Sequence, residues 1–318
     1  MSELEVYLGI DTSCYTTSVA FMDRQANLVG ESRQILKVHE GKCGLQQSEM
    51  VFQHTRNLPE MITNAMPRDA KIIGVCASGY PRPLPDSYMP AFLVGAGLAR
   101  SVSVLNNIPL WLISHQENHL LAGKWSAGGP DDERFLFLHA SGGTTDLLTA
   151  EKDGNGSYKL TEIGGSIDLH AGQFIDRIGV SLGLQFPAGP ALEKFAGAAA
   201  GPVELPVSVK GCKASLSGPA TAAERKLAAG ADPAGIALGV QKVLAETFYR
   251  LICNACREYN TKSVLIAGGV ASNTYIREYL HNKLTGRKIS LWHPQARFSC
   301  DNASGCAAFA VLKGEKSV

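Results

Sequence analysis

His115 and His119 are the side chains in this sequence whose type and spacing best suit a metal ion. On a helix, positions i and i+4 lie one turn apart on the same face, so both imidazoles could reach one cation. Glu117 lies between them, whereas the zinc-protease motif has its glutamate directly after the first histidine. The spacing therefore argues against a protease. Two interpretations remain open, a metal site and a pair of histidines that only form hydrogen bonds within the fold.

A carboxylate near the end of the chain could complete such a site. Asp301 and Asn302 precede a helix of small residues in "RFSCDNASGCAAFA", where an Asp or Asn commonly caps the helix. Borderline cations also take mixed histidine and carboxylate ligands, so Asp301 beside the two histidines would give three protein ligands. Sequence spacing does not show whether the chain brings these residues together.

Two turns of small and polar residues could bind a polyphosphate. "TSCYTT" follows the strand "EVYLGID", and "SGGTT" follows the strand "RFLFLHA". Backbone N–H groups in such turns can point at phosphate oxygens, because glycine permits close approach. Either turn alone is typical of a hairpin, but the duplication, with a third Gly-Gly strand end in "IAGGVASN", favours nucleotide binding. Asp11 ends the first strand, where an acid could position water or a cation.

Two polar residues near helix starts have both a structural and a ligand-binding interpretation. Asp176 lies one or two turns into a helix, where it could accept a hydrogen bond from a ribose hydroxyl or form a surface salt bridge. Asn273 precedes a helix, where it could cap the first turn or bond an adenine edge.

Strands and helices alternate along the chain, which predicts α/β layers. The strand "SVLIAGG" runs into the amphipathic pattern "VASNTYIREYLHNKL". A Gly, Pro and Asp cluster at residues 127–134 is the expected domain boundary. Further helices are expected in "SEMVFQHTRNLPEMITNAM", "AFLVGAGLARSVSVLNN", "GQFIDRIGVSLGL" and "GIALGVQKVLAETFYRLICNACREYN".

Composition limits the classes of partner and compartment. The 318 residues are 45% hydrophobic, enough for a sizeable core, and 30 basic against 29 acidic residues give a net charge of +1. Strong unaided attraction to nucleic acid is therefore not expected, although Arg277, Lys283, Arg287 and Lys288 could contact phosphates or form a solvated helix face. The eight cysteines are scattered, no signal-peptide pattern opens the chain, and no apolar run spans a membrane, so we expect a cytoplasmic protein.

Seven blocks in sequence order resemble the tRNA threonylcarbamoyladenosine transferase family, the TsaD family, formerly named O-sialoglycoprotein endopeptidases. The resemblance implies the actin-like ATPase fold, with two duplicated α/β lobes and a nucleotide cleft between them. The lobes would be residues 1–130 and residues 131–318, the second with a helical insertion. The blocks are "LGIDTSC", "GLARSVSVLNNIPLWLISHQENHLLAG", "FLHASGGTT", "IDLHAGQFIDRIGVSLGLQFPAGPAL", "ASLSGPAT", "LIAGGVASN" and "SCDNASGCAAFA".

The resemblance also implies roles for residues of this chain. In the family, the histidine pair and the late aspartate hold a metal, here His115, His119 and Asp301. Archaeal and eukaryotic members have a tyrosine ligand two residues before Ser-Gly-Gly, where this chain has His139. As a third imidazole ligand, His139 would favour zinc or iron. The alternative is that His139 only forms a hydrogen bond to a neighbouring carbonyl. The threonylcarbamoyl-adenylate would contact Ser141, Gly142, Gly143, Asp176, Gly189 and Asn273.

The chain departs from the family at the first turn and at the Ser-Gly-Gly loop. Family members have acidic residues after "TSC", where this chain has Tyr15 and Thr16, and histidine or asparagine where it has Thr144. The leading hypothesis is metal-dependent transfer of a threonylcarbamoyl group from an adenylate to N6 of a tRNA adenosine, with Asp11 as the nearest candidate for general base. The alternatives are a non-catalytic nucleotide- and metal-binding subunit, transfer to another acceptor, or a phosphotransferase.

We further expect ATP or the adenylate as ligand, and tRNA recruited through a partner protein that supplies basic surface. The chain is expected to dimerise with itself or with a paralogue.

Overall fold

The computed structural model describes residues 3–38, 44–154 and 157–316. The chain forms two compact units, each with its own sheet. Unit 1 contains residues 1–128, 152–158 and 297–318, and unit 2 contains residues 129–151 and 159–296. Among the helices of the described residues, none is long and apolar enough to cross a membrane.

The sheet of unit 1 has five strands in the order β3-β2-β1-β4-β5. β1 pairs antiparallel with β2, β2 pairs antiparallel with β3, and β4 and β5 extend the sheet in parallel from β1. β1 and β2 are buried along nearly their whole length because helices cover both faces of the sheet. The strands are β1 (Leu4–Thr12), β2 (Thr16–Asp23), β3 (Leu28–Ile35), β4 (Ala70–Tyr80) and β5 (Leu110–Ser114).

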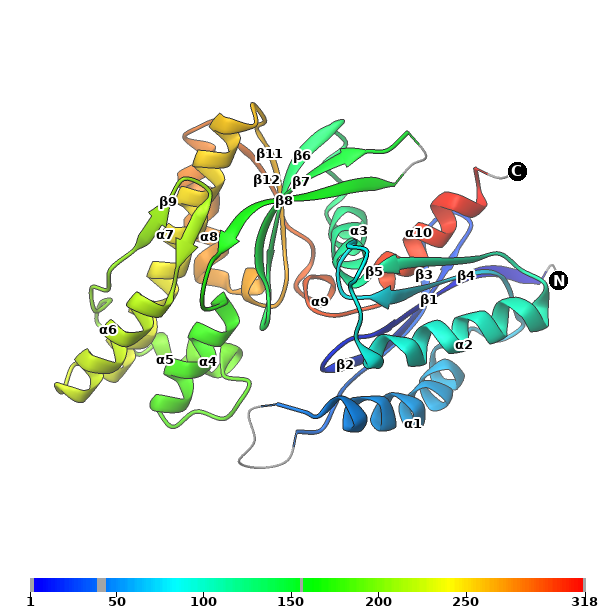
Figure 1. The fold of residues 1–318 in the computed structure, drawn as a ribbon, viewed down its shortest axis with the longest axis horizontal. Helices are drawn as coiled ribbons and strands as arrows, with labels where there is room; N and C mark the ends of the chain where they lie inside the picture. The colour runs from blue at the N-terminus through cyan, green and yellow to red at the C-terminus, as the bar shows by residue number, and fades with distance from the viewer. Residues whose placement is uncertain (1–2, 39–43, 155–156, 317–318) are drawn as a thin grey trace. The chain divides into compact units, whose positions relative to one another are not determined.

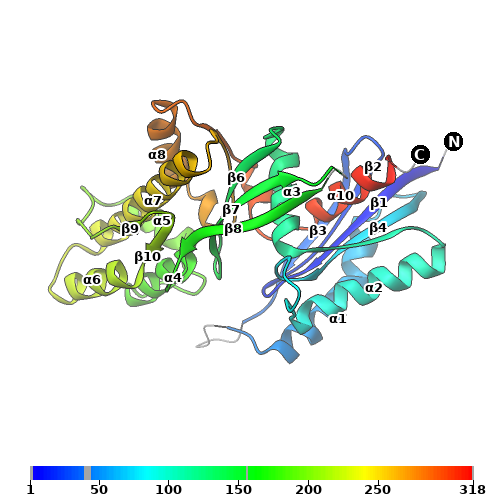
Figure 2. The same ribbon diagram turned by 45° about the horizontal axis from the view of Figure 1, so that its top comes forward.

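Two pairs of helices cover opposite faces of this sheet (Figures 1 and 2). α1 (Gln47–Ala65) and α2 (Pro90–Asn106) pack on one face, and α3 (His115–Ala127) and α10 (Ser304–Gly314) on the other. Gly9 of β1 allows α10 to lie against the sheet, because a Cβ there would be 2.4 Å from the carbonyl oxygen of Ala303. α10 therefore lies directly on the strand that ends in the first polar turn.

A capping box begins α3 and explains the glutamate between the two histidines. The Ser114 hydroxyl accepts from the Glu117 N–H at 3.1 Å, and the Glu117 carboxylate accepts from the Ser114 N–H at 2.7 Å. Glu117 thus satisfies the helix terminus, and the two histidines occupy the first and second turns of the same helix.

Unit 2 repeats the strand order of unit 1 and extends it. Its sheet runs β12-β11-β6-β7-β8-β10-β9, so β8-β7-β6-β11-β12 corresponds to β3-β2-β1-β4-β5. β6 pairs antiparallel with β7, and β11 and β12 extend the sheet in parallel. The strands are β6 (Arg134–Ala140), β7 (Thr145–Lys152), β8 (Tyr158–Ser166), β9 (Ser208–Lys210), β10 (Lys213–Ser215), β11 (Ser263–Ala267) and β12 (Ser290–Trp292).

α7 (Pro233–Glu258) is the central helix of unit 2, and its side chains form much of the core. Asp232 accepts from the N–H groups of Ala234 and Gly235 and so caps it. The expected helices are confirmed as α1, α2, α4, α7 and α8. Besides α7, the helices between β8 and α10 in the chain are α4 (Ala171–Ser181), α5 (Gly189–Ala196), α6 (Ser217–Ala228), η1 (Val270–Ser272), α8 (Thr274–Thr285) and α9 (Ala296–Ser299).

Candidate functional site

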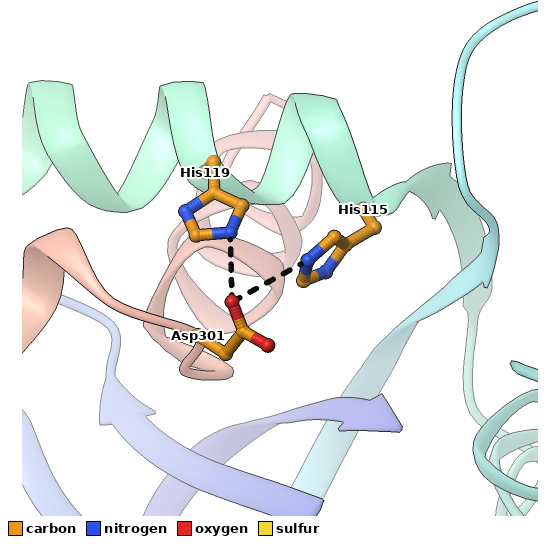
Figure 3. A group of neighbouring side chains, drawn as sticks. All are labelled: His115, His119 and Asp301. Carbon is orange, nitrogen blue, oxygen red and sulfur yellow. Dashed lines mark hydrogen bonds and ion pairs between the residues drawn. The ribbon is translucent and has the colours of Figure 1, made fainter. Parts of the chain in front are cut away.

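His115, His119 and Asp301 converge on one point in unit 1 (Figure 3). Oδ1 of Asp301 lies 3.2 Å from Nε2 of His119 and 3.7 Å from Nε2 of His115. The two imidazole rings meet edge to face, with centroids 4.6 Å apart. Three potential ligand atoms of these residues all lie within 4.8 Å of one another.

Packing between α3 and the segment before α10 brings the aspartate to the histidines. The Asn118 side chain donates to the carbonyl oxygen of Asn302 at 2.6 Å and accepts from the N–H of Cys306 at 2.8 Å. A Cβ at Gly305 would lie 2.0 Å from the carbonyl oxygen of Asn118, so the close approach requires glycine. Asn118, one residue before His119, therefore fixes the chain that directly follows Asp301.

The end of β1 contacts this cluster from the opposite direction. Oδ1 of Asp11 lies 2.9 Å from Nδ1 of His115, and the Ser13 hydroxyl donates to Oδ2 of Asp301 at 2.5 Å. Asp11 and Ser13 are buried, with 0% and 1% exposure. Four elements of unit 1 thus meet here: β1, the β1–β2 turn, α3 and the residues before α10.

Electrostatic interactions within the cluster keep the carboxylate charged. Burial would raise the pKa of Asp301, but hydrogen bonds from His115 and His119 outweigh it and hold the pKa well below its usual value. Burial would lower the pKa of His115, but Asp11 and Asp301 outweigh it and raise the pKa well above its usual value. The charged form of Asp301 and the protonated form of His115 therefore stabilise each other, and a cation at this point would replace the proton on Nε2 of His115.

The donor set fits a transition metal. Two imidazole nitrogens and one carboxylate oxygen are ligands of zinc and non-haem iron, with bonds of about 2.0–2.2 Å. Tetrahedral ligands at such distances are about 3.3 Å apart, and the two nitrogen–oxygen distances here are 3.2 and 3.7 Å. Three protein ligands would leave coordination positions for a substrate or water.

His139 belongs to unit 2, at the end of β6. Its ring stacks on Phe137 with centroids 5.7 Å apart, and its partner in the register of β7 is Asp146. Metal ligation by His139 stays a prediction.

The Ser-Gly-Gly loop of unit 2 is an open turn. The N–H of Ser141 donates to the carbonyl oxygen of Thr144 at 2.8 Å, and Gly142 and Gly143 are exposed. A Cβ added at either glycine would meet no described heavy atom within 4 Å. The start of α4 packs beneath the turn, since a Cβ at Gly172 would lie 2.4 Å from the Cα of Gly142. The turn is thus supported from below and open on its glycine side.

The remaining predicted nucleotide residues also lie in unit 2. Oδ1 of Asp176 accepts from the N–H of Ala188 at 2.7 Å, and burial raises the pKa of Asp176. Gly189 begins α5. Asn273 caps α8 by accepting from the N–H of Ile276 at 3.0 Å, which confirms its structural interpretation. Nucleotide contacts by these residues stay predictions.

Two of the four basic residues considered for RNA have structural roles. The Arg277 guanidinium donates to the carbonyl oxygens of Ala271 and Pro294, both at 2.9 Å. Arg287 donates to the hydroxyl of Tyr249 at 2.6 Å. These contacts favour a structural role for Arg277 and Arg287 over contacts with phosphates.

His54 is a buried residue at the first turn that the sequence pattern did not single out. Its Nε2 donates to the carbonyl oxygen of Ser13 at 2.8 Å, and its Nδ1 accepts from the Thr17 hydroxyl at 2.8 Å. A single histidine on the amphipathic helix α1 gives no local sign that it reaches a turn about 40 residues earlier.

Comparisons with known proteins agree with this arrangement. The TsaD family model, described as tRNA N6-adenosine threonylcarbamoyltransferase, matches residues 88–308. A probable bifunctional tRNA threonylcarbamoyladenosine biosynthesis protein of Methanothermobacter thermautotrophicus is 28% identical over 309 residues, which cover 96% of this chain and 55% of that protein. The chain thus spans about half the length of this relative. The tRNA N6-adenosine threonylcarbamoyltransferase of Nitrosomonas eutropha is 28% identical over 316 residues, covering 96% of this chain and 91% of that protein.

Solved structures support the expected fold. The HypF protein of T. kodakarensis superposes with a TM-score of 0.61 at 14% identity, covering 99% of this chain and 48% of that chain. At this identity the likeness shows the fold alone, and it is the actin-like ATPase fold that the family resemblance implies. The family match extends over more than half of the residues and includes both histidines and Asp301. The chain therefore belongs to the TsaD family of tRNA N6-adenosine threonylcarbamoyltransferases.

Proposed function

We propose that this protein transfers a threonylcarbamoyl group from an adenylate to N6 of an adenosine in tRNA. The observation that carries the proposal is the convergence of His115, His119 and Asp301 in a member of this family. The acceptor amine would attack the carbamoyl carbon and lose one proton to solvent, the bond from that carbon to the phosphate oxygen would break, and AMP would leave.

His115, His119 and Asp301 would hold the metal, zinc or iron by the donor set. When bound, the ion supplies Lewis-acid polarisation of a carbonyl or phosphoryl oxygen. The carboxylate of Asp301 lowers the net charge of the bound ion by one unit and leaves the imidazoles as neutral donors. His139 is kept as a fourth candidate ligand.

The turn at Ser141, Gly142 and Gly143 would bind the phosphate of the adenylate through the backbone N–H groups of its glycines, since the Ser141 N–H bonds to the carbonyl oxygen of Thr144. Its support is the open glycine side of the turn, where no described side chain would hinder a ligand. Asp176, Gly189 and Asn273 would contact the adenosine. The Asp176 carboxylate has one oxygen bonded to the N–H of Ala188, so its other oxygen is the one to bond a ribose hydroxyl.

The first turn supports a second candidate function, carbamoyl transfer to a different acceptor or a non-catalytic role in a tRNA-modifying complex. The side chains there are a phenol at Tyr15 and a hydroxyl at Thr16, so neither position presents a carboxylate. An acceptor recognised through acids at these positions would not be recognised by this chain.

Partners and location also remain proposals. With a net charge of +1, the chain would need a partner protein to contribute basic surface for tRNA. One relative is named as bifunctional in this pathway, and its name supports a role for this chain in association with other activities. We further propose a dimer with itself or a paralogue, and a cytoplasmic location.

The test is reconstitution of the transfer. The metal-loaded protein would be incubated with ATP, threonine, bicarbonate, an adenylate-forming enzyme and tRNA, and the digested nucleosides analysed by mass. Threonylcarbamoyladenosine in excess of a reaction without this protein would support the proposal. Metal-loaded protein that consumes adenylate but leaves tRNA unmodified would favour another acceptor, and protein that neither consumes adenylate nor modifies tRNA would favour the non-catalytic role.

His119→Ala is the variant for this assay, because it removes one proposed ligand. Thr12→Val is the matched control, since Thr12 is equally buried but its hydroxyl donates to Ala91, on the side of α2. Activity retained by His119→Ala and by the control would contradict a role for the cluster.

A further inference from the structure

Asp11 is bonded to a proposed metal ligand in a way that determines which imidazole nitrogen is free. Its carboxylate accepts from Nδ1–H of His115 at 2.9 Å. A neutral imidazole with its proton on Nδ1 has its lone pair on Nε2. Nε2 is the atom that lies 3.7 Å from Oδ1 of Asp301. Asp11 therefore keeps the proton on Nδ1, so Nε2 is the nitrogen that would give up its proton and bind the cation.

Ser13 has the corresponding effect on the carboxylate. Its hydroxyl donates to Oδ2 of Asp301 at 2.5 Å, which leaves Oδ1 to face both histidines. Ser13 is itself held by the turn, because its N–H donates to the carbonyl oxygen of Thr16 at 3.0 Å. Asp11 at the end of β1 and Ser13 in the following turn thus orient two ligands that come from distant parts of the chain.

His54 fixes the turn that carries Ser13 and directly follows the end of β1. It is fully buried on α1 and donates from Nε2 to the carbonyl oxygen of Ser13. Its Nδ1 accepts from Thr17, whose hydroxyl also accepts from the Asn57 amide at 3.2 Å. A chain of hydrogen bonds therefore leads from α1 through the turn to Asp301.

The geometry leads us to propose that Asp11 and Ser13 are positioning residues for the cation site, each orienting one ligand. The inference rests on the proposed function and replaces the expectation that Asp11 is the general base. Asp11 is 0% exposed and one of its oxygens is bonded to His115, whereas a base must reach the proton of the acceptor amine. Among the described residues, Oδ2 of Asp11 has no hydrogen-bond partner, so His115 is the group whose orientation Asp11 controls.

Partners that orient metal ligands contribute about 10- to 100-fold to metal affinity. The test is titration of the full chain with Co²⁺ in the absence of nucleotide and tRNA, with the dissociation constant and the visible absorption bands as readouts. We expect Asp11→Asn and Ser13→Ala to bind Co²⁺ about 10- to 100-fold more weakly than wild type, with altered bands. Thr12→Val, between them, should bind as wild type does.

The possible results separate this inference from the proposed function. If Asp11→Asn and Ser13→Ala bind Co²⁺ as tightly as Thr12→Val, with unchanged bands, the positioning roles are wrong. If Asp11 were instead the general base, Asp11→Asn would bind Co²⁺ as wild type does but would lose turnover. If wild type itself binds no Co²⁺, the metal site of the proposed function is overturned. Asp11→Ala serves as a second variant, and thermal unfolding of each variant identifies any that does not fold.

Discussion

The turns after β1 and β6 are closed by the same backbone hydrogen bond but have different surroundings. Each follows the first strand of its sheet, and each is closed by a hydrogen bond from a serine N–H to a threonine carbonyl oxygen three residues later. The bond is 3.0 Å between Ser13 and Thr16, and 2.8 Å between Ser141 and Thr144. The duplicated fold thus places one kind of turn in each unit.

The difference lies in what each turn presents. The first turn presents buried side chains, with Ser13 bonded to Asp301 and the preceding Asp11 bonded to His115. The second presents backbone, because Gly142 and Gly143 leave open space on that side. Side chains can orient other side chains, whereas bare backbone N–H groups can approach a phosphate. The comparison shows that the residues within a turn determine whether it presents side chains or backbone.

The largest effect should follow loss of a ligand beside the first turn. Asp301→Ala removes the only carboxylate of the three-residue cluster, and we expect metal affinity to fall by more than about 100-fold. Nucleotide binding in the absence of metal should not change, because the second turn belongs to the other unit. Isothermal titration with Co²⁺ and with ADP measures both. An equal loss of affinity for both ligands would remove the distinction between the turns.

Loss of the support beneath the second turn should cost stability. In Gly172→Ala the added Cβ would lie 2.4 Å from the Cα of Gly142, and backbone atoms cannot move away cheaply. We expect the free energy of unfolding to fall by about 2–3 kcal/mol, measured by urea denaturation. Gly97→Ala is the control, because a Cβ there meets nothing within 4 Å among the described residues. Equal stability of the two variants would contradict the close packing.

A side chain on the open face of the second turn should separate binding from stability. Gly143→Val adds a branched side chain where no described atom lies within 4 Å. We expect affinity for ADP to fall about 10-fold, the loss of roughly one charge-assisted hydrogen bond, with little change in unfolding. Co²⁺ affinity should stay at the wild-type value. Unchanged ADP affinity would show that the nucleotide does not use this turn.

The smallest effect should be a pH dependence confined to the first turn. Burial lowers the pKa of His54 from 6.5, and this outweighs the bond to Ser13 and the charge of Asp11, which raise it. Because the folded pKa is lowered, His54 stabilises the fold above pH 6.5, and the stabilisation is lost as the pH falls through that value. Wild type should therefore lose more stability than His54→Gln between pH 7.5 and 5.5 in urea denaturation. Parallel profiles would refute the assignment.

Local patterns in the sequence were enough to predict both turns and the elements around them. Alternating and continuous apolar runs specify β1, β2, β6, β7 and β11, and their Ser, Thr and Gly boundaries mark the turns. The pairing of His115 with His119 also follows from one helical period. The family resemblance supplied the expectation that Asp301 joins them.

The physical reasons for that proximity are contacts between distant segments. Asp301 reaches the histidines because Gly305 lets α10 lie against α3 and because Asn118 bonds to the segment that follows Asp301, at Asn302 and Cys306. The role of His54 also depends on a contact between distant segments, because its position on a helix does not predict a hydrogen bond to Ser13. Residues in such contacts have no characteristic local spacing, so only the folded structure shows their roles.

The metal content of wild type and His119→Ala after loading with zinc or iron is the most direct test of the cation site. Elemental analysis should find one ion per chain in wild type and in Thr12→Val, and none in His119→Ala. One ion per chain in His119→Ala, with its fold intact, would contradict the site formed by His115, His119 and Asp301.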